Sequence, residues 1–245
     1  MFVQVVRTEL IKLRRAPVWI AFFALTALSA VMGTFNYLSN TGILTKQWYS
    51  LWTQHTLFAG FFFVPSLLGV LCAYLWRLEH LENNWNALIS RPVPLWMIFG
   101  GKLAVAAALS FLTQAATGVF YLMSGLYAGF DAPLPPELPR WLLMGACGGV
   151  AVCSVQLFIS MAVRSFAPPV AVALAGGVAG LAFTSAGLGL IQPYALVALG
   201  MDANGMGALA PEQYAAFFAS CAAYTAIPWA LATLWLGRRD VTTHS

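Results

Sequence analysis

Long uncharged apolar runs alternate with short polar connections along the whole chain. An α-helix needs about 20 apolar residues to cross the hydrocarbon core of a bilayer. Six runs reach that length without an Asp, Glu or Arg well inside them, and they cover residues 16–38, 53–76, 95–127, 141–163, 169–191 and 213–236. The pattern predicts an all-α membrane protein with six transmembrane helices.

The composition places nearly all of the chain in the membrane. Of 245 residues, 60% are hydrophobic and 8% are charged. The connections stay below about 25 residues, which is short for an independent soluble domain. We therefore expect residues 1–245 to form a single transmembrane domain. The four cysteines all fall inside predicted spans without the spacing of a metal site, so we interpret them as apolar core residues and expect no bound metal: Cys72, Cys147, Cys153 and Cys221.

The basic residues fall mainly on one side of the predicted membrane. Ten of the twelve Lys and Arg residues share that side, namely Arg7, Lys12, Arg14, Arg15, Arg77, Arg91, Lys102, Arg164, Arg238 and Arg239. Lys46 and Arg140 lie on the other side. The positive-inside rule then predicts a multi-pass protein with both termini in the cytoplasm. The same asymmetry suits anionic lipid head groups, so the basic pI does not indicate a nucleic-acid partner.

A cleaved signal peptide is an alternative interpretation of the first apolar run. Arg14 and Arg15 precede that run, and Leu28-Ser29-Ala30 resembles a cleavage site. However, the run is longer than the 7–15 apolar residues of a signal peptide. We therefore favour an uncleaved first helix.

The first fifteen residues have the pattern of an amphipathic helix. One helical stripe is apolar (Phe2, Val3, Val6, Leu10 and Leu13), and charged residues occupy the rest. This predicts a helix over Phe2–Arg15 that lies in the cytoplasmic membrane interface. The alternative is an ordinary basic flank.

The connection between spans two and three has a second amphipathic pattern. Leu78, Leu81, Trp85, Leu88 and Ile89 recur at helical spacing, and polar residues fill the opposite face: Glu79, Glu82, Asn83 and Asn86. Pro92 and Pro94 end this predicted helix. We expect a cytoplasmic helix with an exposed acidic face.

An aromatic and polar cluster marks the start of the second span. It consists of Trp48, Tyr49, Trp52, Gln54 and His55. Such a cluster at the outer mouth can contact a substrate, or its Trp and Tyr side chains can anchor the protein in the bilayer interface. Further along the chain, we expect Pro193–Leu199 to form a short interfacial helix.

The sequence offers almost no residues for catalysis. Gly100-Gly101-Lys102 lacks both the spacing and the hydroxyl residue of a phosphate-binding loop, and the H-E-x-x-H and G-x-S-x-G motifs do not occur. Ion-coupled transport usually leaves an ionisable residue that faces the interior of the helix bundle. Only His55 qualifies, near the outer end of its span. We therefore expect no enzymatic activity, and transport would take its energy from another subunit.

Several strings in residues 1–125 resemble a known family. They are Phe35-Asn36-Tyr37, Asn40-Thr41-Gly42, Trp48 to Gln54, Leu57-Phe58, Phe62 to Pro65, Arg77, Glu79-His80, Asn84-Trp85-Asn86, Pro92-Val93 and Lys102-Leu103. Together with the predicted topology, they make the chain similar to the permease subunit of a type-2 ABC exporter. More specifically, it resembles the lantibiotic-immunity permeases, the EpiG, MutG and SpaG-like group.

The resemblance implies a function and partners. It implies a bacterial cytoplasmic-membrane permease that removes a lantibiotic-like or other amphipathic peptide from the membrane. A separate ABC ATPase would bind ATP and magnesium, this chain would hold no cofactor, and a second permease, identical or a sister subunit, would complete the pathway within the lipid. The alternatives are the same fold exporting a drug or a lipid, and a membrane sensor or assembly module that transports nothing.

The resemblance also assigns roles to residues. The segment from about Leu78 to Ile89 would be the coupling helix that docks on the ATPase. There, Glu79 and Glu82 would make ionic contacts, Trp85 would be an apolar anchor, and Asn86 would lie in the docking face. The N-terminal helix, with Arg7, Glu9 and Lys12, would be the connecting helix that lies against the coupling helix.

Overall fold

The computed structural model describes residues 1–81, 84–85, 92–206 and 209–238. Within these ranges all regular structure is helical. The principal helices are α1 (Phe2–Leu13), α2 (Val18–Ser39), α3 (Gln47–Phe58), α4 (Val64–His80), α6 (Leu95–Tyr127), α7 (Leu138–Ala162), α8 (Ala167–Ser185), α9 (Ala195–Gly200) and α10 (Tyr214–Gly237). Short turns complete them: a π-helix η1 (Ala59–Phe63) and the 3₁₀ turns η2 (Gly189–Ile191), η3 (Ala203–Gly205) and η4 (Pro211–Gln213).

Six helices in the described part of the chain are long and apolar enough to span a membrane, which confirms the predicted fold class. The third span, Leu95–Tyr127, has the predicted bounds. The second is longer than expected, because α3, η1 and α4 run without a break from Gln47 to His80. The fifth is shorter, and ends at Ser185. Gly187 follows with a φ of +74°, a left-handed conformation in which a right-handed helix cannot continue.

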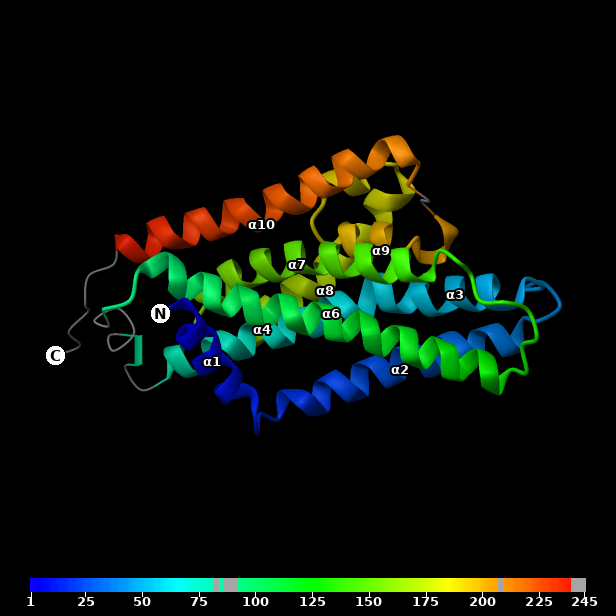
Figure 1. Ribbon diagram of the computed structural model, residues 1–245, viewed down its shortest axis with the longest axis horizontal. Helices are drawn as coiled ribbons and strands as arrows, with labels where there is room; N and C mark the ends of the chain where they lie inside the picture. Colours follow the sequence, from blue (N-terminus) through cyan, green and yellow to red (C-terminus); the bar gives the residue numbers. More distant parts are fainter. Residues whose placement is uncertain (82–83, 86–91, 207–208, 239–245) are drawn as a thin grey trace.

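The spans form an elongated bundle in which the N-terminus and the last turn of α10 lie at the same end (Figure 1). We call this the terminal end, and the opposite end, where α2 leads into α3, the loop end. Helix α7 is central, since it packs against α4, α6, α9 and α10. Helix α2 packs on α3 and α6, while α8 covers α4. Much of α2, α8 and α10 stays exposed and apolar, which is the surface that a membrane protein presents to lipid.

The second span contains a π-helix at Ala59–Phe63, which ends two residues before Pro65. Proline lacks the N–H that would continue the α-helical bonding pattern, so that pattern is also interrupted just after the π-helix. The wider turn packs against α8, where a Cβ atom built on Gly177 would lie 2.4 Å from the Phe61 carbonyl oxygen. The two backbones can approach closely only because position 177 has no side chain.

The segment after α8 enters the bundle instead of lying in the interface. Every residue of α9 is buried. Its backbone touches α7, where a Cβ built on Gly148 would lie 2.5 Å from the Leu196 carbonyl oxygen. The Trp52 indole N–H also donates to the Met201 carbonyl at 2.8 Å. The predicted helix is therefore present, but its interfacial location is wrong, because its small apolar residues fit between α7 and α8.

Helix α1 lies across the terminal end of the bundle, against α6 (Figure 1). The predicted N-terminal helix is thus present. Its inward face includes Leu13 and Glu9, both buried, while Val3, Leu10 and Ile11 are exposed. The apolar stripe expected from the sequence is therefore divided, and an acidic residue lies on the face that packs against the bundle.

Candidate functional site

Four charged side chains from three helices meet at the terminal end of the bundle. Glu9 and Lys12 come from α1, Glu79 from the last turn of α4, and Lys102 from the second turn of α6. We call them the charged cluster. The Lys102 side chain is completely buried and both carboxylates are 6% exposed. The cluster joins the N-terminal helix to two membrane spans.

Each lysine bonds both carboxylates. Lys102 Nζ donates to Glu9 Oε2 at 2.9 Å and to Glu79 Oε1 at 2.8 Å. Lys12 Nζ donates to Glu9 Oε1 at 2.6 Å and also to Glu79 Oε1. These four contacts close a ring of alternating charge with no net charge.

The Lys102 ammonium has two more partners. It donates to the Leu75 carbonyl oxygen at 2.5 Å and lies 4.6 Å from the centroid of the Trp76 ring. A buried ammonium group is costly unless its donors are satisfied, and the face of an aromatic ring attracts a cation. Lys102 is therefore held against α4 by backbone, ring and carboxylate together.

Two glycines allow α1 to come close enough to complete the cluster. A Cβ built on Gly101 would lie 2.6 Å from Val5 Cγ1, and one built on Gly100 would lie 2.6 Å from the Trp229 ring. Both distances are too short for real atoms. The Gly100-Gly101 pair therefore lets α1 and α10 pack directly on α6, next to Lys102.

The two carboxylates keep Lys12 charged. Burial alone would lower the pKa of its ammonium group, but the attraction of Glu9 and Glu79 outweighs that effect and raises the pKa above its ordinary value of 10.5. Lys12 therefore stays protonated while it bridges the two carboxylates.

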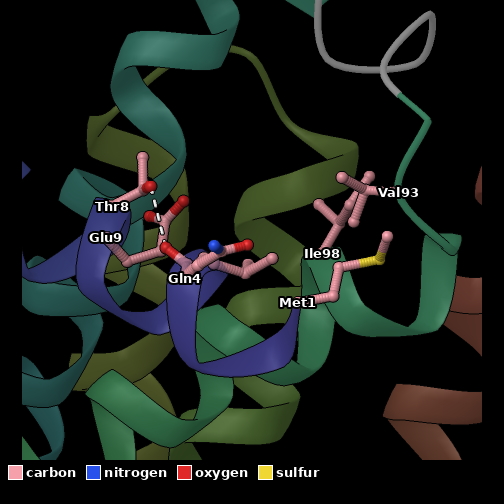
Figure 2. Close-up of a pocket in the computed structure, with 7 residues that line it drawn as sticks. Met1, Gln4, Thr8, Glu9, Val93 and Ile98 are labelled. Atoms are coloured by element: carbon pink, nitrogen blue, oxygen red, sulfur yellow. Dashed lines mark hydrogen bonds between the residues drawn. The ribbon is translucent and has the colours of Figure 1, made fainter.

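A hollow of about 160 Å³ opens beside the cluster, between α1 and the start of α6. Figure 2 shows Gln4, Thr8 and Glu9 on one side of it and Val93 and Ile98 on the other. The Thr8 hydroxyl bonds the Gln4 carbonyl of its own helix at 2.9 Å. The N-terminal half of α1 is therefore incompletely packed where the chain enters α6.

Aromatic rings surround the end of α4. Trp85 stacks on His80, with centroids 5.6 Å apart and an interplanar angle of 6°. It also lies 5.8 Å from Trp76 and 5.9 Å from Trp235 of α10. His80 Nε2 bonds the Ser160 carbonyl at the end of α7 at 2.8 Å. We call Trp76, His80, Trp85 and Trp235 the aromatic clamp, because they tie the residues after α4 to α7 and α10.

The residues expected to dock on an ATPase occupy different environments. Glu79 is only 5% exposed and its carboxylate faces the charged cluster, so its predicted exposure is wrong. The periodicity placed it on a polar face, but α1 covers that face. Trp85 is half-buried in the aromatic clamp. Glu82 and Asn86 lie outside the described residues. A docking role for this segment stays a prediction.

The three residues assigned to the connecting helix separate into two groups. Glu9 and Lys12 turn into the bundle and belong to the charged cluster. Arg7 is exposed on the other side of α1. The helix therefore contacts the end of α4 through Lys12 and contacts α6 through Glu9.

The aromatic and polar cluster at the loop end is mostly internal. Trp48, Trp52, Gln54 and His55 are all buried, while Tyr49 is 43% exposed. Their expected location at an open mouth is thus wrong for four of the five. Trp52 stacks on Trp141 with centroids 5.2 Å apart, and Trp48 packs on Tyr121 at 5.3 Å. These rings fill the core between the loop-end turns, and a substrate contact stays a prediction.

Hydrogen bonds satisfy the polar members of that cluster. The Asn36 amide donates to Gln54 Oε1 at 2.6 Å, and His55 Nε2 lies 3.0 Å from the Thr34 hydroxyl. Tyr49 is the exception to burial, and its hydroxyl donates to Glu137 at 2.9 Å. Gln54 and His55 therefore connect the second span to α2.

The sequence placed Lys102 on the cytoplasmic side, in an incomplete match to a phosphate-binding loop and in one family string, but predicted no partner for it. Its role as the centre of the charged cluster was missed, as was the pairing of Glu9 with Lys102 across 93 positions of sequence. One signal was available. A lysine that follows two glycines inside an apolar run must be paired, and the glycines mark a close helix contact.

Comparison with known families agrees with this architecture. A family model described as ABC-2 family transporter protein matches residues 5–180, a range that contains the whole charged cluster. Comparison with curated proteins and with solved structures finds no match. The expected relation to type-2 ABC permeases is confirmed, while the finer resemblance to lantibiotic-immunity permeases stays a prediction. The chain belongs to the ABC-2 transporter family, as a membrane permease subunit that works with an ABC ATPase.

Proposed function

We propose that this permease subunit exports a lantibiotic-like or other amphipathic peptide from the cell membrane, with energy from its partner ATPase. The observation that carries the coupling part of this proposal is the position of Glu79. It lies in the last turn of α4, one residue before the helix ends at His80, and it is bonded to Lys12 of α1 and Lys102 of α6. A displacement of the chain after α4 would therefore reach two other helices through the charged cluster.

The distribution of charge supports the orientation. The topology predicted from the sequence assigns ten of the twelve basic residues to the side that carries the N-terminus, so the terminal end would face the cytoplasm of a bacterium. The charged cluster and the aromatic clamp would then face the ATPase, which would bind ATP and magnesium. The segment Leu78–Ile89 would dock there, with Glu82, Trp85 and Asn86 next to the partner and Glu79 on the inner side.

A second permease, identical or a sister subunit, would complete the transport pathway. The exposed apolar surfaces of α2, α8 and α10 leave room for such a partner as well as for lipid. The lantibiotic part of the proposal rests on the sequence strings described above. The same architecture would also serve an exporter of drugs or lipids.

The test is co-expression of the chain with an ABC ATPase encoded beside it, in a bacterium that lacks both. We expect the ATPase to copurify with the chain, its turnover to change in the presence of the chain, and the cells to survive a lantibiotic that kills the host. Lys102→Met should abolish survival, while Lys46→Met, an exposed substitution at the loop end, should not.

Other results would favour one of the alternative functions or contradict ATP-driven export. Protection against a hydrophobic drug alone would support the drug-export alternative. Recovery of a histidine kinase without any ATPase would overturn the transport proposal and favour a sensor. Survival that persists with a catalytically dead ATPase would contradict ATP-driven export.

A further inference from the structure

An apolar groove runs along the outside of the bundle between α2 and α6. Its volume is about 400 Å³. The lining comes only from these two helices and contains no charged residue; it consists of Ala27, Ala30, Val31, Thr34, Phe35, Leu38, Phe120, Met123, Ser124 and Tyr127. The groove is separate from the charged cluster, because it lies in the loop-end half of both spans.

The groove opens sideways, away from the bundle. Phe35 is 72% exposed and Tyr127 is 79% exposed at its rim, and Val31 and Met123 are exposed as well. Because α2 and α6 are membrane spans, these side chains face hydrocarbon. A molecule that reaches the groove therefore comes from the bilayer and not from water.

The length of the groove matches one leaflet. From Ala27 to Leu38 the helix rises about 16 Å at 1.5 Å per residue. The hydrocarbon core of a bilayer is about 30 Å thick, so one leaflet contributes about 15 Å. The groove also ends where the helices end, since α2 stops at Ser39 and α6 at Tyr127. Its outer end is therefore at the level of the lipid head groups.

The floor of the groove suits a chain without polar groups. Thr34 and Ser124 supply the hydroxyls there, and the two oxygens are 2.7 Å apart. Thr34 also lies 2.7 Å from the Ala30 carbonyl oxygen and 3.0 Å from His55 Nε2. Since these hydroxyls already have partners in the protein, an apolar chain can cover them without leaving an unsatisfied polar group.

We propose that the groove binds one acyl chain of a phospholipid from the leaflet at the loop end, with its head group beyond Leu38 and Tyr127. The chain would bury apolar area on both helices, and the uncharged lining would exclude the head group. This is a lipid site on the subunit itself, independent of the exported substrate and of the partner ATPase.

The experiment uses the full-length protein in nanodiscs of phosphatidylglycerol that contain a trace of the same lipid with a photoreactive diazirine in one acyl chain. After irradiation, labelled peptides are identified by mass spectrometry. We expect enrichment of peptides covering 27–38 and 120–127 over those from the exposed surface of α10. Ala27→Phe places a ring in one end of the groove and should lower this labelling about five- to tenfold, which corresponds to the loss of about one to two buried methylene groups.

The matched control is Ala226→Phe, which adds the same ring to an exposed position of α10. It should leave the labelling of the groove unchanged. Equal labelling of the groove and of α10 in the wild type would mean nonspecific lipid contact and would overturn the proposal. A second result would also overturn the proposal: no labelling of the groove, together with a disulfide-linked dimer of the Phe35→Cys variant. A second copy of the chain would then occupy the groove.

Discussion

Lys102 Nζ lies 2.8 Å from Glu79 Oε1, a contact that joins the second turn of α6 to the last turn of α4. Lys102 has no exposed surface, and the pair is enclosed by α1, which adds a carboxylate and a second ammonium group. A neutral ring of this kind holds three helices in one arrangement. Removal of any one charge leaves the other three with a net charge in a largely buried cluster.

The first prediction concerns that imbalance. Lys102→Met keeps an unbranched side chain, shorter by the charged terminal atom, and leaves Glu9 and Glu79 with Lys12 as their cation within the charged cluster. Breaking a buried ion pair on one side costs about 3–5 kcal/mol. We therefore expect a large drop in the midpoint of thermal unfolding in detergent, measured by tryptophan fluorescence.

A second substitution tests whether charge is the cause. Glu79→Gln in the Lys102→Met background restores neutrality, so the double variant should recover part of the lost stability. If the double variant loses as much stability as Lys102→Met and Glu79→Gln lose in sum, the ring arrangement is contradicted. Lys46→Met, at an exposed site, should stay within about 0.5 kcal/mol of the wild type.

The second prediction concerns the pH above which Lys12 no longer stabilises the packing of α1 on the bundle. The folded state raises the pKa of Lys12 above its ordinary value of 10.5. A group with a raised pKa contributes its full stability below the unfolded pKa and loses it as pH rises through the folded pKa. The stability difference between the wild type and Lys12→Met should therefore be constant from neutral pH to about pH 10 and shrink above 10.5.

The unfolding midpoints of both proteins, measured across that pH range, give this difference. Lys12→Arg provides the control, because arginine stays charged throughout. A difference that already disappears near neutral pH would show that Lys12 is not held by the two carboxylates.

The third prediction tests the close contact between α1 and α6. In Gly101→Ala the new Cβ would lie 2.6 Å from Val5 Cγ1, so the side chain or the whole of α1 must shift. Overpacking of this kind costs about 1–3 kcal/mol. Thermal unfolding should show this loss, and Val5→Ala in the same chain should reverse it by removing the clashing methyl group.

Gly42→Ala is the matched control, since no atom lies within 4 Å of a Cβ at that position. A loss of stability at position 101 that Val5→Ala does not reverse would place the strain in α6 itself rather than in its contact with α1.

The spans were predictable from the sequence because crossing a bilayer is a local requirement. A run of apolar residues must be long enough wherever it packs, and Leu95–Tyr127 shows this with its expected bounds. The start of the second span was missed because Gln47 to Gln54 are mixed in polarity. Their polar side chains are covered by α2 and the loop-end turns, and this packing cannot be predicted from the local sequence.

The charged cluster was not predictable in the same way. Helical spacing placed Glu79 on a polar face, but spacing says nothing about which helix covers that face. Its partners Lys12 and Lys102 lie 67 and 23 positions away in sequence. Similarly, Trp48 and Trp52 have the pattern of interfacial anchors, and only the packing of Trp141 and Tyr121 shows that they are core residues.

The fourth prediction separates two roles of Trp85. Its ring stacks on His80 and packs edge-on against Trp235. Trp85→Ala should therefore lower the stability with which the chain after α4 packs on the bundle, by about 1–3 kcal/mol. We expect several-fold less ATPase to copurify at unchanged abundance of the permease in the membrane. Trp85→Phe should retain most of the partner.

Trp235→Ala distinguishes the causes. If Trp85 acts by positioning the segment within this chain, Trp235→Ala should also lower recovery of the ATPase. If Trp85 is itself an anchor in the partner, only the change at position 85 should do so. Equal recovery of the ATPase with all three variants would contradict both roles.

The fifth prediction concerns Gln54 and His55 at the loop end. Gln54→Ala with His55→Ala removes the acceptor of the Asn36 amide and the ring beside Thr34. The Asn36 amide then lacks its acceptor, at a cost of about 1–3 kcal/mol, and the lost side chains leave space next to Tyr121. We expect lower membrane abundance and a lower unfolding midpoint, with any loss of peptide resistance in proportion to the lost protein.

Tyr49→Phe removes only an exposed hydrogen bond to Glu137 and should change stability by less than about 0.5 kcal/mol. A double variant that is as stable and abundant as the wild type but no longer protects cells would reverse this interpretation, because Gln54 and His55 would then act on the substrate and not on the fold.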